Sequence, residues 1–401
     1  MINKNTSADV VVIGAGPGGS SVAFNCAKAG LNVILLEKLQ QIGLYKRCAE
    51  GLSLGSLKII EENLGTKIPQ KCIAQIINGA IVYAPNGKSV IIDFEENAGA
   101  IMERKIFDKW LAYQASKEGA YVQAKTNVYD IIKENDFIKG VKAEFEGEKF
   151  EIKSKITVAA DGVESIIARK AGLNTTNQLI NIDSGFQYEM SNLKIEDPNK
   201  IYLWFGNKIA PRGYVWLFPK GKDIANVGIG VAMSEKPAKY YLDKFIENHP
   251  EIFENSSILE INAGGIPVGG FLENMVLNGF LVVGDAAHQV NPIHGGGLKE
   301  ATVAGKIAAN AIVNAIKKND FSEKILFEYN KMWWKERGDS LKKVEKLRHV
   351  VEKLSDNDFN MLAEQLTGDD LVEFSRGSRL SVLAKILMKK PSLLKLGKYL
   401  I

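Results

Sequence analysis

Residues 9–19 read DVVVIGAGPGG. The apolar run that ends at Ile13 predicts a buried strand, and the glycines after it predict a tight turn into a helix. Within that turn, Gly14, Gly16 and Gly19 match the pattern G-x-G-x-x-G. The first glycine permits the turn, the second lets the backbone approach a pyrophosphate, and the third lets the helix pack closely on the strand. The free N–H groups that begin such a helix attract phosphate.

A second strand and a carboxylate complete this pattern. The helix is expected over residues 17–30 and the next strand over 31–36, directly before an acidic residue. A carboxylate about 20 positions after the glycines accepts hydrogen bonds from the adenosine ribose in dinucleotide-binding folds. A glycine turn without a ligand is the alternative, but the complete unit favours dinucleotide binding by Gly14, Gly16, Gly19 and Glu37.

A second glycine cluster lies far along the chain. Asp285 follows an apolar strand expected at 280–283, and a long helix is expected over residues 297–317. The start of that helix offers amide groups and a positive dipole end to a ribityl chain, a pyrophosphate or a flavin edge. An NAD enzyme does not need this second site, so both clusters together predict FAD. The cluster consists of Gly295, Gly296, Gly297 and Leu298.

Two aspartates in these elements have an alternative role. Asp161 follows several strands expected over residues 121–160 and forms a third, weaker element of the predicted FAD site. Asp161 and Asp285 are also well placed to cap the helices that follow them, which requires no ligand.

The remaining patterns predict how the chain is organised. Strands are expected at 76–83 and 89–94, a helix at 104–119, and a strand-rich, aromatic region at 178–233. The strand near residue 280 is expected in the same sheet as the first strand. We therefore predict an α/β (α+β composite) fold in three parts. They are a discontinuous Rossmann-like FAD-binding domain (1–75, 101–178 and 264–320), an inserted antiparallel-sheet substrate domain (76–100 and 179–263) and a C-terminal helical region with a basic tail (321–401).

Composition excludes several classes of protein. The 401 residues carry a net charge of only +4, which argues against nucleic acid as a partner. Three cysteines, Cys26, Cys48 and Cys72, do not make a disulfide scaffold and fit a reducing compartment. With four histidines and no zinc spacing, no metal site is expected. We expect a cytoplasmic protein without a membrane-spanning helix.

In this order, the three elements resemble the flavoprotein class that includes para-hydroxybenzoate hydroxylase, squalene epoxidase and flavin halogenases. Residues 47–51, RCAEG, resemble the R-C-G-E-G segment of geranylgeranyl reductases. Residues 214–220, YVWLFPK, with GIG at 228–230, resemble their substrate motif Y-x-W-x-F-P-K…G-x-G. Over most of its length the chain is similar to archaeal digeranylgeranylglycerophospholipid reductases. One departure is Ala49, where this family usually has glycine.

The resemblance implies a set of FAD contacts. Taken alone, Arg104 could equally be a surface residue at a helix start, and Val128 ordinary strand core. The implied contacts are Gly18, Glu37, Cys48, Ala49, Gly51, Arg104, Val128, Asp285, Gly297 and Leu298.

The resemblance also implies a prenyl substrate. Tyr214, Trp216 and Phe218 alternate with period two, so they share one face of a strand, with Trp204 and Phe205 on a neighbouring strand. Burial of a prenyl chain on such a face stabilises binding by about 0.8 kcal/mol per CH₂. The alternative is that these rings are sheet core. The implied substrate is a prenylated glycerophospholipid or a prenyl diphosphate, bound by Tyr214, Trp216, Phe218 and Pro219.

The implied reaction saturates isolated alkenes by hydride transfer from reduced FAD and protonation of the other carbon. An unactivated alkene accepts hydride poorly, so a well-placed acid is needed. Cys48 is the candidate proton donor, because the resemblance places it at the flavin; a small packed residue beside FAD is the alternative.

The sequence is compatible with more than one electron donor and with more than one function. The single dinucleotide fingerprint is assigned to FAD, which suits an external donor, either ferredoxin or NAD(P)H. The main competing function is a class A flavin monooxygenase acting on an aromatic or isoprenoid substrate. A quinone-linked electron-transfer flavoprotein would carry a C-terminal cysteine cluster, whereas no cysteine follows Cys72.

The C-terminal tail has its own pattern. Residues 374–401 contain seven basic and no acidic residues, and leucines recur among them at helical spacing. A basic amphipathic helix lies readily on an anionic membrane, so peripheral contact with the cytoplasmic membrane face is predicted. The alternative is a helix packed on the body with a solvated basic face.

Overall fold

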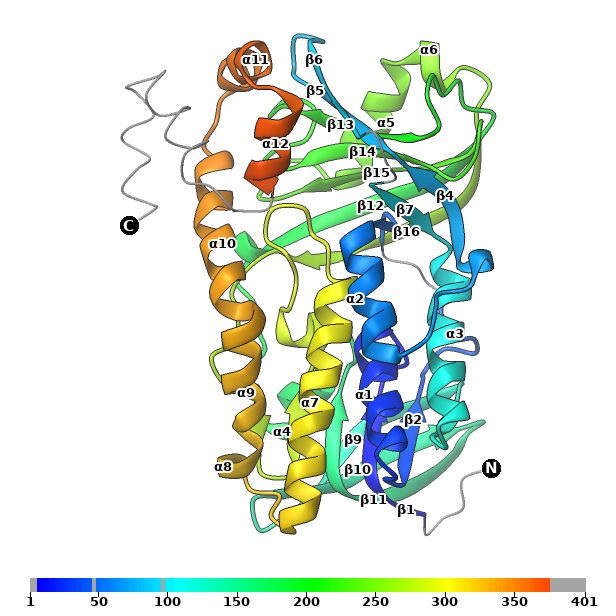
Figure 1. Ribbon diagram of the computed structural model, residues 1–401, viewed down its shortest axis with the longest axis vertical. Helices are drawn as coiled ribbons and strands as arrows, with labels where there is room; N and C mark the ends of the chain where they lie inside the picture. Colours follow the sequence, from blue (N-terminus) through cyan, green and yellow to red (C-terminus); the bar gives the residue numbers. More distant parts are fainter. Residues whose placement is uncertain (1–5, 45–47, 95–97, 376–401) are drawn as a thin grey trace.

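The computed structural model describes residues 6–44, 48–94 and 98–375. Two large sheets lie at opposite ends of the molecule, and helices α8–α12 run beside both of them (Figure 1). The predicted α/β composite fold, with a Rossmann-like parallel sheet, a second sheet and C-terminal helices, is confirmed.

The eight-stranded sheet carries the nucleotide-binding unit. Its central strands are parallel, in the order β18-β11-β1-β2-β8, with β17 antiparallel to β18 and the β9–β10 hairpin antiparallel to the first half of β11. The first strand and the strand near residue 280 were predicted to belong to one sheet. This is confirmed, because β1 and β18 pair with opposite edges of β11. The strands are β1 (Ser7–Ile13), β2 (Val33–Leu36), β8 (Tyr121–Gln123), β9 (Thr126–Glu134), β10 (Phe137–Phe145), β11 (Glu148–Ala159), β17 (Val276–Leu277) and β18 (Phe280–Val282).

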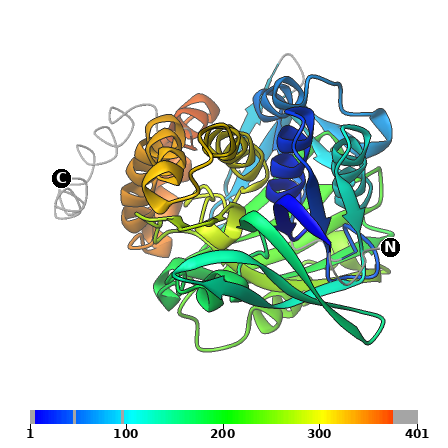
Figure 2. The ribbon, with the colours of Figure 1, turned by 90° about the horizontal axis from the view of Figure 1, so that it is seen from below.

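Helices cover this sheet on the side of the glycine-rich turn. The long helix α7 packs on α1, and α1 packs on α3. Helices α7 and α1 approach closely at Gly305, where an added Cβ would lie 2.7 Å from the Cβ of Ser21. Seen from below, the C-terminal helices lie beside α7, on the side away from α3 (Figure 2). The four helices of this layer are α1 (Pro17–Lys28), α2 (Leu54–Leu64), α3 (Arg104–Lys117) and α7 (Leu298–Lys318), and the short helix α4 (Ile166–Ala171) follows β11.

The seven-stranded sheet has the order β16-β12-β15-β14-β13-β5-β6. It is antiparallel as predicted, except that β13 and β5 pair in parallel. Its outer face packs on α5 (Ala238–Glu247) and α6 (Pro250–Phe253), and its inner face borders a cavity. The strands are β5 (Gly79–Tyr83), β6 (Ser89–Asp93), β12 (Ile182–Ser191), β13 (Lys200–Phe205), β14 (Tyr214–Pro219), β15 (Ala225–Val231) and β16 (Ser257–Pro267).

A small third sheet corrects one prediction. The strand expected over 76–83 is in fact two strands, because the chain passes from the small sheet to the large one at Asn78. Apolar residues lie on both sides of Asn78 and Gly79, which favoured one continuous strand, although an Asn-Gly pair is itself a turn signal. The small sheet has the order β3-β7-β4, and the predicted domain boundaries at 75/76 and 100/101 fall inside two of its strands. They are β3 (Gly51–Ser53), β4 (Ile73–Ile77) and β7 (Gly99–Met102).

Between residues 321 and 375 the chain is mostly helical, as expected. A five-residue π-helical turn at 334–338 joins α9 to α10. In the part of the chain that the structure describes, no helix is both long and apolar enough to cross a bilayer. Of the predicted basic tail, residues 374–401, all but the first two lie outside the described residues. The helices are α8 (Glu323–Leu326), α9 (Glu328–Trp333), α10 (Asp339–Val351), α11 (Asp356–Gln365) and α12 (Gly368–Ser375).

Candidate active site

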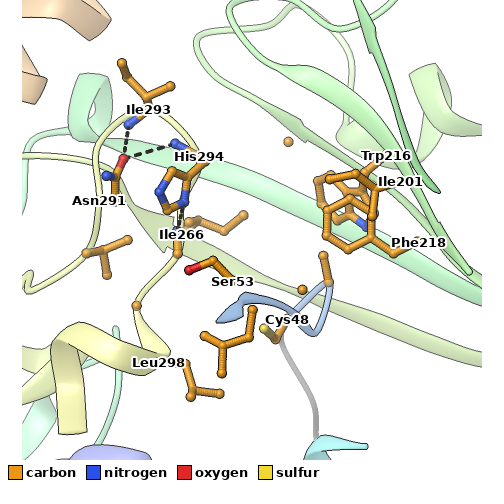
Figure 3. A pocket seen from close by; sticks show the side chains of 18 of the residues that line it. Cys48, Ser53, Ile201, Trp216, Phe218, Ile266, Asn291, Ile293, His294 and Leu298 are labelled. Atoms are coloured by element: carbon orange, nitrogen blue, oxygen red, sulfur yellow. Dashed lines mark hydrogen bonds between the residues drawn. The ribbon is translucent and has the colours of Figure 1, made fainter. Parts of the chain in front are cut away.

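A cavity of about 1580 Å³ lies between the two large sheets. This exceeds the roughly 300–1,000 Å³ of an ordinary small-molecule pocket, so it has room for a cofactor together with a long substrate. Trp216 and Phe218 lie on one side of it and His294 on the other, with Cys48 between them (Figure 3). We call the side formed by the glycine turns the flavin wall, and the side formed by the seven-stranded sheet the aromatic wall.

The first glycine turn belongs to the flavin wall. Gly16 lines the cavity, and a Cβ added there would meet no protein atom within 4 Å, so its open side faces the cavity. The other glycines of the fingerprint serve the turn itself. A Cβ on Gly19 would lie 2.0 Å from the carbonyl oxygen of Gly14, and one on Gly14 would lie 2.3 Å from that of Ala160. Gly18 also lines the cavity, whereas Gly14 and Gly19 do not.

Glu37 is held against the same turn. Its Oε2 atom accepts a hydrogen bond from the N–H of Ala15 at 3.0 Å, and its Oε1 atom accepts one from Leu39 at 3.0 Å. These bonds fix the carboxylate at the carboxyl end of β2, beside the glycines. The position is the one expected for a ribose ligand, although Glu37 is not part of the cavity lining.

The second glycine cluster completes the flavin wall. Asp285, Gly295, Gly296, Gly297 and Leu298 all line the cavity. They surround the first turn of α7, whose N–H groups and dipole favour negative charge. The cradle at Gly16 and this helix start therefore fit a dinucleotide and the flavin that follows it.

His294 stands at the edge of this cluster. Its Nδ1 atom accepts a hydrogen bond from the N–H of Gly296 at 3.1 Å. Desolvation inside the cavity, aided by nearby Lys299 and opposed by Glu300, lowers the pKa of His294 to about 4, so the ring is neutral at pH 7. The ring therefore adds no charge to the flavin wall.

Cys48 lies on the segment that joins the two walls. The N–H of Glu50 donates to its Sγ atom at 3.2 Å, and Gln187 Nε2 donates to its carbonyl oxygen at 3.2 Å. Burial raises the pKa of the Cys48 thiol, while the guanidinium of Arg104 beside it acts in the opposite direction. The thiol is thus protonated at neutral pH and faces the cavity. Arg47, the first residue of the RCAEG segment, lies outside the described residues.

The aromatic wall is built by alternate residues of β14. Tyr214, Trp216 and Phe218 all line the cavity, as period two predicts. A Cβ on Gly228 would lie 2.4 Å from the Trp216 indole, so the ring lies against the backbone of β15. Phe218 packs in the same way against Gly51, where a Cβ would lie 2.6 Å from its ring.

Two polar contacts fix this wall. The indole N–H of Trp216 donates to Gln187 Oε1 at 2.9 Å, and the Tyr214 hydroxyl donates to the carbonyl oxygen of His294 at 2.9 Å. On the neighbouring strand β13, Phe205 faces the cavity together with Ile201 and Leu203. Trp204 points to the opposite face and packs in the core beneath α5, because adjacent strand residues alternate.

Four residues predicted to bind the cofactor or the substrate have other positions or other partners. Some lie away from the cavity, and others are bound to groups of the protein itself. Val128 is buried in the core of the eight-stranded sheet, and Pro219 ends β14 away from the cavity. Asp161 Oδ2 accepts the N–H of Ile167 at 2.9 Å, so it caps α4 as its alternative role predicted. Arg104 lines the cavity but forms a bidentate ion pair with Asp108, at 2.8 Å for each bond.

Several site residues escaped sequence reasoning. Gln187 and Asn226 hold the backbone of the Cys48 segment, and Glu50 and Lys220 meet beneath it. Glu50 and Lys220 lie inside the two quoted motifs, so the motifs marked both residues as candidates. Their pairing could not be predicted, because the two positions are 170 residues apart in the sequence. Asp183 also lines the cavity, and no local pattern marks it. Among the described residues there is no His, Cys, Asp and Glu cluster suited to a metal ion.

The fold and the two-walled cavity define a flavin-dependent oxidoreductase. A family model described as FAD dependent oxidoreductase matches residues 9–178, and one described as Geranylgeranyl reductase catalytic domain matches residues 181–266. The first match contains the first glycine turn and the second contains most of the aromatic wall, while the second glycine cluster lies outside both. FAD is therefore the cofactor.

Full-length relatives identify the family. The chain is 42% identical to the digeranylgeranylglycerophospholipid reductase of Methanocaldococcus jannaschii, over 100% of both chains. It is 40% identical to digeranylgeranylglycerophospholipid reductase 1 of Methanothermobacter thermautotrophicus, over 99% of this chain and 100% of that one. This chain belongs to the digeranylgeranylglycerophospholipid reductase family.

Solved structures agree with this assignment. A geranylgeranyl bacteriochlorophyll reductase-like protein from Thermoplasma acidophilum superposes with a TM-score of 0.88, at 34% identity and over 99% of this chain and 100% of that one. A flavin-dependent brominase shares the fold, with a TM-score of 0.74 and 19% identity over 96% of this chain and 100% of that one. The family assignment favours a reductase over the monooxygenase alternative.

Proposed function

We propose that this protein saturates the double bonds of geranylgeranyl chains in prenylated glycerophospholipid precursors of archaeal membrane lipids. The observation that carries the proposal is the position of Cys48. Its protonated thiol faces a cavity whose one wall fits FAD and whose other wall is aromatic. Reduced FAD supplies a hydride when it is bound. The chain itself has to bind the prenyl group, exclude water and deliver a proton.

The walls of the cavity suit a long hydrocarbon. Beyond Trp216 the lining continues over apolar side chains of β6 and of the C-terminal helices. Each CH₂ buried there stabilises binding by about 0.8 kcal/mol, without a need for polar partners. The apolar lining includes Val90, Ile92, Leu203, Phe205, Phe359, Leu362 and Leu366.

Cys48 is the proton donor in this proposal. The S–H bond breaks as the proton passes to one alkene carbon, while the hydride passes to the other carbon and two C–H bonds form. Bound reduced FAD would supply the hydride and with it both of the electrons that reduce the alkene. The thiolate then takes a proton from solvent. A raised thiol pKa keeps the proton on sulfur until the alkene needs it.

The direct test is anaerobic. The purified holoenzyme is reduced with dithionite and mixed with digeranylgeranylglyceryl phosphate, while the flavin absorbance and the product mass are followed. We expect flavin reoxidation and a gain of two hydrogens for each bond reduced. No reoxidation, followed by hydroxylation of an aromatic substrate once air is admitted, would instead support the monooxygenase.

Substitution of the thiol tests the role of Cys48. Cys48→Ala is expected to keep FAD and to lower turnover by about 10²-fold or more, as is usual when a general acid is removed. Cys48→Ser keeps the size of the side chain and serves as the matched control for packing. Full activity of the alanine variant would exclude the acid role.

An external protein or nicotinamide must re-reduce the flavin, and we propose ferredoxin or NAD(P)H for this role. Rapid mixing of the oxidised holoenzyme with reduced ferredoxin, and separately with NADPH, distinguishes the two by the rate at which the flavin band bleaches. Bleaching with neither donor on the turnover timescale would exclude both.

We also propose that the protein is cytoplasmic and touches the membrane surface through residues after Arg379. A lipid substrate makes such contact useful, and each basic residue near an anionic surface contributes about 1 kcal/mol. Truncation after Arg379 is expected to abolish sedimentation with anionic liposomes. Unchanged sedimentation would contradict the proposal.

A further inference from the structure

A buried ion cluster lies directly behind Cys48. Lys220, at the end of the aromatic motif, places its Nζ atom 3.3 Å from Glu50 Oε2, 2.9 Å from Glu103 Oε2 and 3.1 Å from Glu189 Oε2. The side chain of Glu50 is fully buried and that of Lys220 is 4% exposed. Burial would lower the pKa of Lys220, but the three carboxylates raise it, so the lysine stays charged.

Glu50 connects this cluster to the thiol. Its Oε1 atom accepts the N–H of Arg104 at 2.8 Å, and its Oε2 atom accepts Asn226 Nδ2 at 2.7 Å. Its own N–H points to Cys48 Sγ at 3.2 Å, and its φ of +74° is a left-handed conformation that an ordinary residue adopts only when its surroundings enforce it. The carboxylate therefore anchors the backbone group that holds the sulfur.

We propose that Glu50, clamped by Lys220, is the positioning residue that aims the Cys48 thiol into the cavity for proton transfer. The catalytic part of this inference rests on the proposed function, whereas the geometric part does not. Separate segments supply the two charges: the loop before β3 carries Glu50, and the end of β14 carries Lys220. The clamp thus ties the proton donor to the strand whose rings border the substrate.

The clamp predicts the direction in which each substitution shifts the pKa of the Cys48 thiol. The negative charge of Glu50 raises the pKa of the Cys48 thiol, after burial and against Arg104. Neutralising Glu50 must therefore lower the thiol pKa, whereas removing Lys220 leaves the Glu50 charge less compensated and must raise it. A purely structural role would not give opposite shifts, because loosening the segment exposes the thiol in either variant.

The test measures thiol reactivity in the FAD-loaded protein. Iodoacetamide alkylation of Cys48 is followed by mass spectrometry over a pH series; Cys26 and Cys72 are buried and serve as internal references. For Glu50→Gln we expect the midpoint of the alkylation rate to fall by about one pH unit. For Lys220→Met we expect it to rise by a similar amount, and for Lys220→Arg we expect little change.

Kinetics then connect the clamp to turnover. In both Glu50→Gln and Lys220→Met, kcat is expected to fall about 10-fold or more with KM within about twofold, because the thiol is misplaced and prenyl binding is not. Glu103→Gln is the control, since it neutralises another partner of Lys220 that is 30% exposed and does not hold the Cys48 segment. Its alkylation midpoint is expected to stay near that of the wild type.

Shifts in the same direction for Glu50→Gln and Lys220→Met, or no shift in either, would overturn the proposal. If Glu50→Gln does not fold with FAD, the Lys220→Met and Lys220→Arg pair decides: equal midpoints in that pair refute the clamp. If the wild type fails to reduce prenyl substrates, the proposed function fails, while the alkylation result still answers the geometric question.

Discussion

The two walls of the cavity both depend on glycine, but for different reasons. On the flavin wall, Gly19 is needed because a Cβ would lie 2.0 Å from the carbonyl oxygen of Gly14, five residues earlier in the same turn. On the aromatic wall, Gly228 is needed because a Cβ would lie 2.4 Å from the indole of Trp216, a side chain on the neighbouring strand. In the first case a backbone atom excludes the Cβ, and in the second case a side chain excludes it.

This difference predicts which wall can accommodate an added methyl group. A backbone oxygen cannot move without moving the strand and helix attached to it, so the flavin wall is rigid. A ring can rotate or shift, at the cost of its packing and hydrogen bond. The flavin wall should therefore fail by unfolding or by loss of cofactor, and the aromatic wall by loss of catalytic rate.

The largest effect is expected for Gly19→Ala. The added methyl group must push α1 away from β1, which we expect to destabilise the protein by about 3 kcal/mol or more and to abolish FAD binding. Urea unfolding and the flavin content of the purified protein measure both effects. Gly55→Ala, in the first turn of α2 at the edge of the cavity, is the control for stability: its Cβ meets nothing within 4 Å, so the free energy of unfolding should stay the same or rise slightly. Normal flavin content in Gly19→Ala would refute the rigid-wall interpretation.

Gly228→Ala is the equivalent substitution in the aromatic wall and should be milder. The indole of Trp216 must shift and lose its bond to Gln187, at a cost of about 1–3 kcal/mol. We expect FAD to be retained and kcat to fall about 10-fold, because Gln187 also holds the carbonyl of Cys48. Steady-state kinetics beside flavin titration measure this. Loss of FAD without loss of stability would contradict the separation of the two walls.

Gly16→Ala distinguishes an effect on FAD affinity from an effect on the stability of the protein. No protein atom would meet the added Cβ within 4 Å, so the free energy of unfolding of the apoprotein should stay within about 0.5 kcal/mol of the wild type. The FAD dissociation constant should rise about 10-fold, because the methyl group occupies the approach to the pyrophosphate. Calorimetric titration of the apoprotein with FAD gives this number, and an unchanged constant would place the pyrophosphate elsewhere.

The smallest effect concerns one carboxyl group on each wall. Asp161 on the flavin side accepts the N–H of Ile167 through Oδ2, while its Oδ1 atom and Asp183 Oδ1 both have no hydrogen-bond partner among the described residues. Burial raises the pKa of Asp183 to about 7, with Glu352 acting in the same direction and Arg348 and Arg212 opposing it. Because the folded pKa lies above the unfolded value of ~3.9, its stability contribution is complete below about pH 4 and is lost as pH rises through 7.

Asp183→Asn should remove this dependence. We expect the variant to gain about 1 kcal/mol relative to the wild type between pH 4 and 7 and to keep that gain above pH 7. The amount stays modest because the new amide N–H group also needs a partner. Thermal unfolding at a series of pH values measures the difference, with Asp243→Asn as the control on the outer face of the same sheet. Parallel curves for Asp183→Asn and the wild type would show that the buried carboxyl does not titrate in this range.

Sequence reasoning succeeded where neighbours in the chain are also neighbours in space. The glycine turn, Glu37, the start of α7 and the alternation of Tyr214, Trp216 and Phe218 each depend on a few consecutive residues and one known backbone geometry. It failed at Asn78, where the chain changes sheets within one apolar run, and at Trp204, which alternation assigns to the opposite face from Phe205.

By itself, then, the sequence determined a dinucleotide fold with two glycine clusters, an aromatic strand and, through its resemblance, the family and the cysteine. Only the tertiary structure decided that Gly228 accommodates Trp216, that Gln187 joins that ring to Cys48, and that Lys220 clamps Glu50. The physical reason is distance along the chain. Propensity and periodicity act over a few residues, whereas these contacts join segments brought together only by sheet pairing and burial.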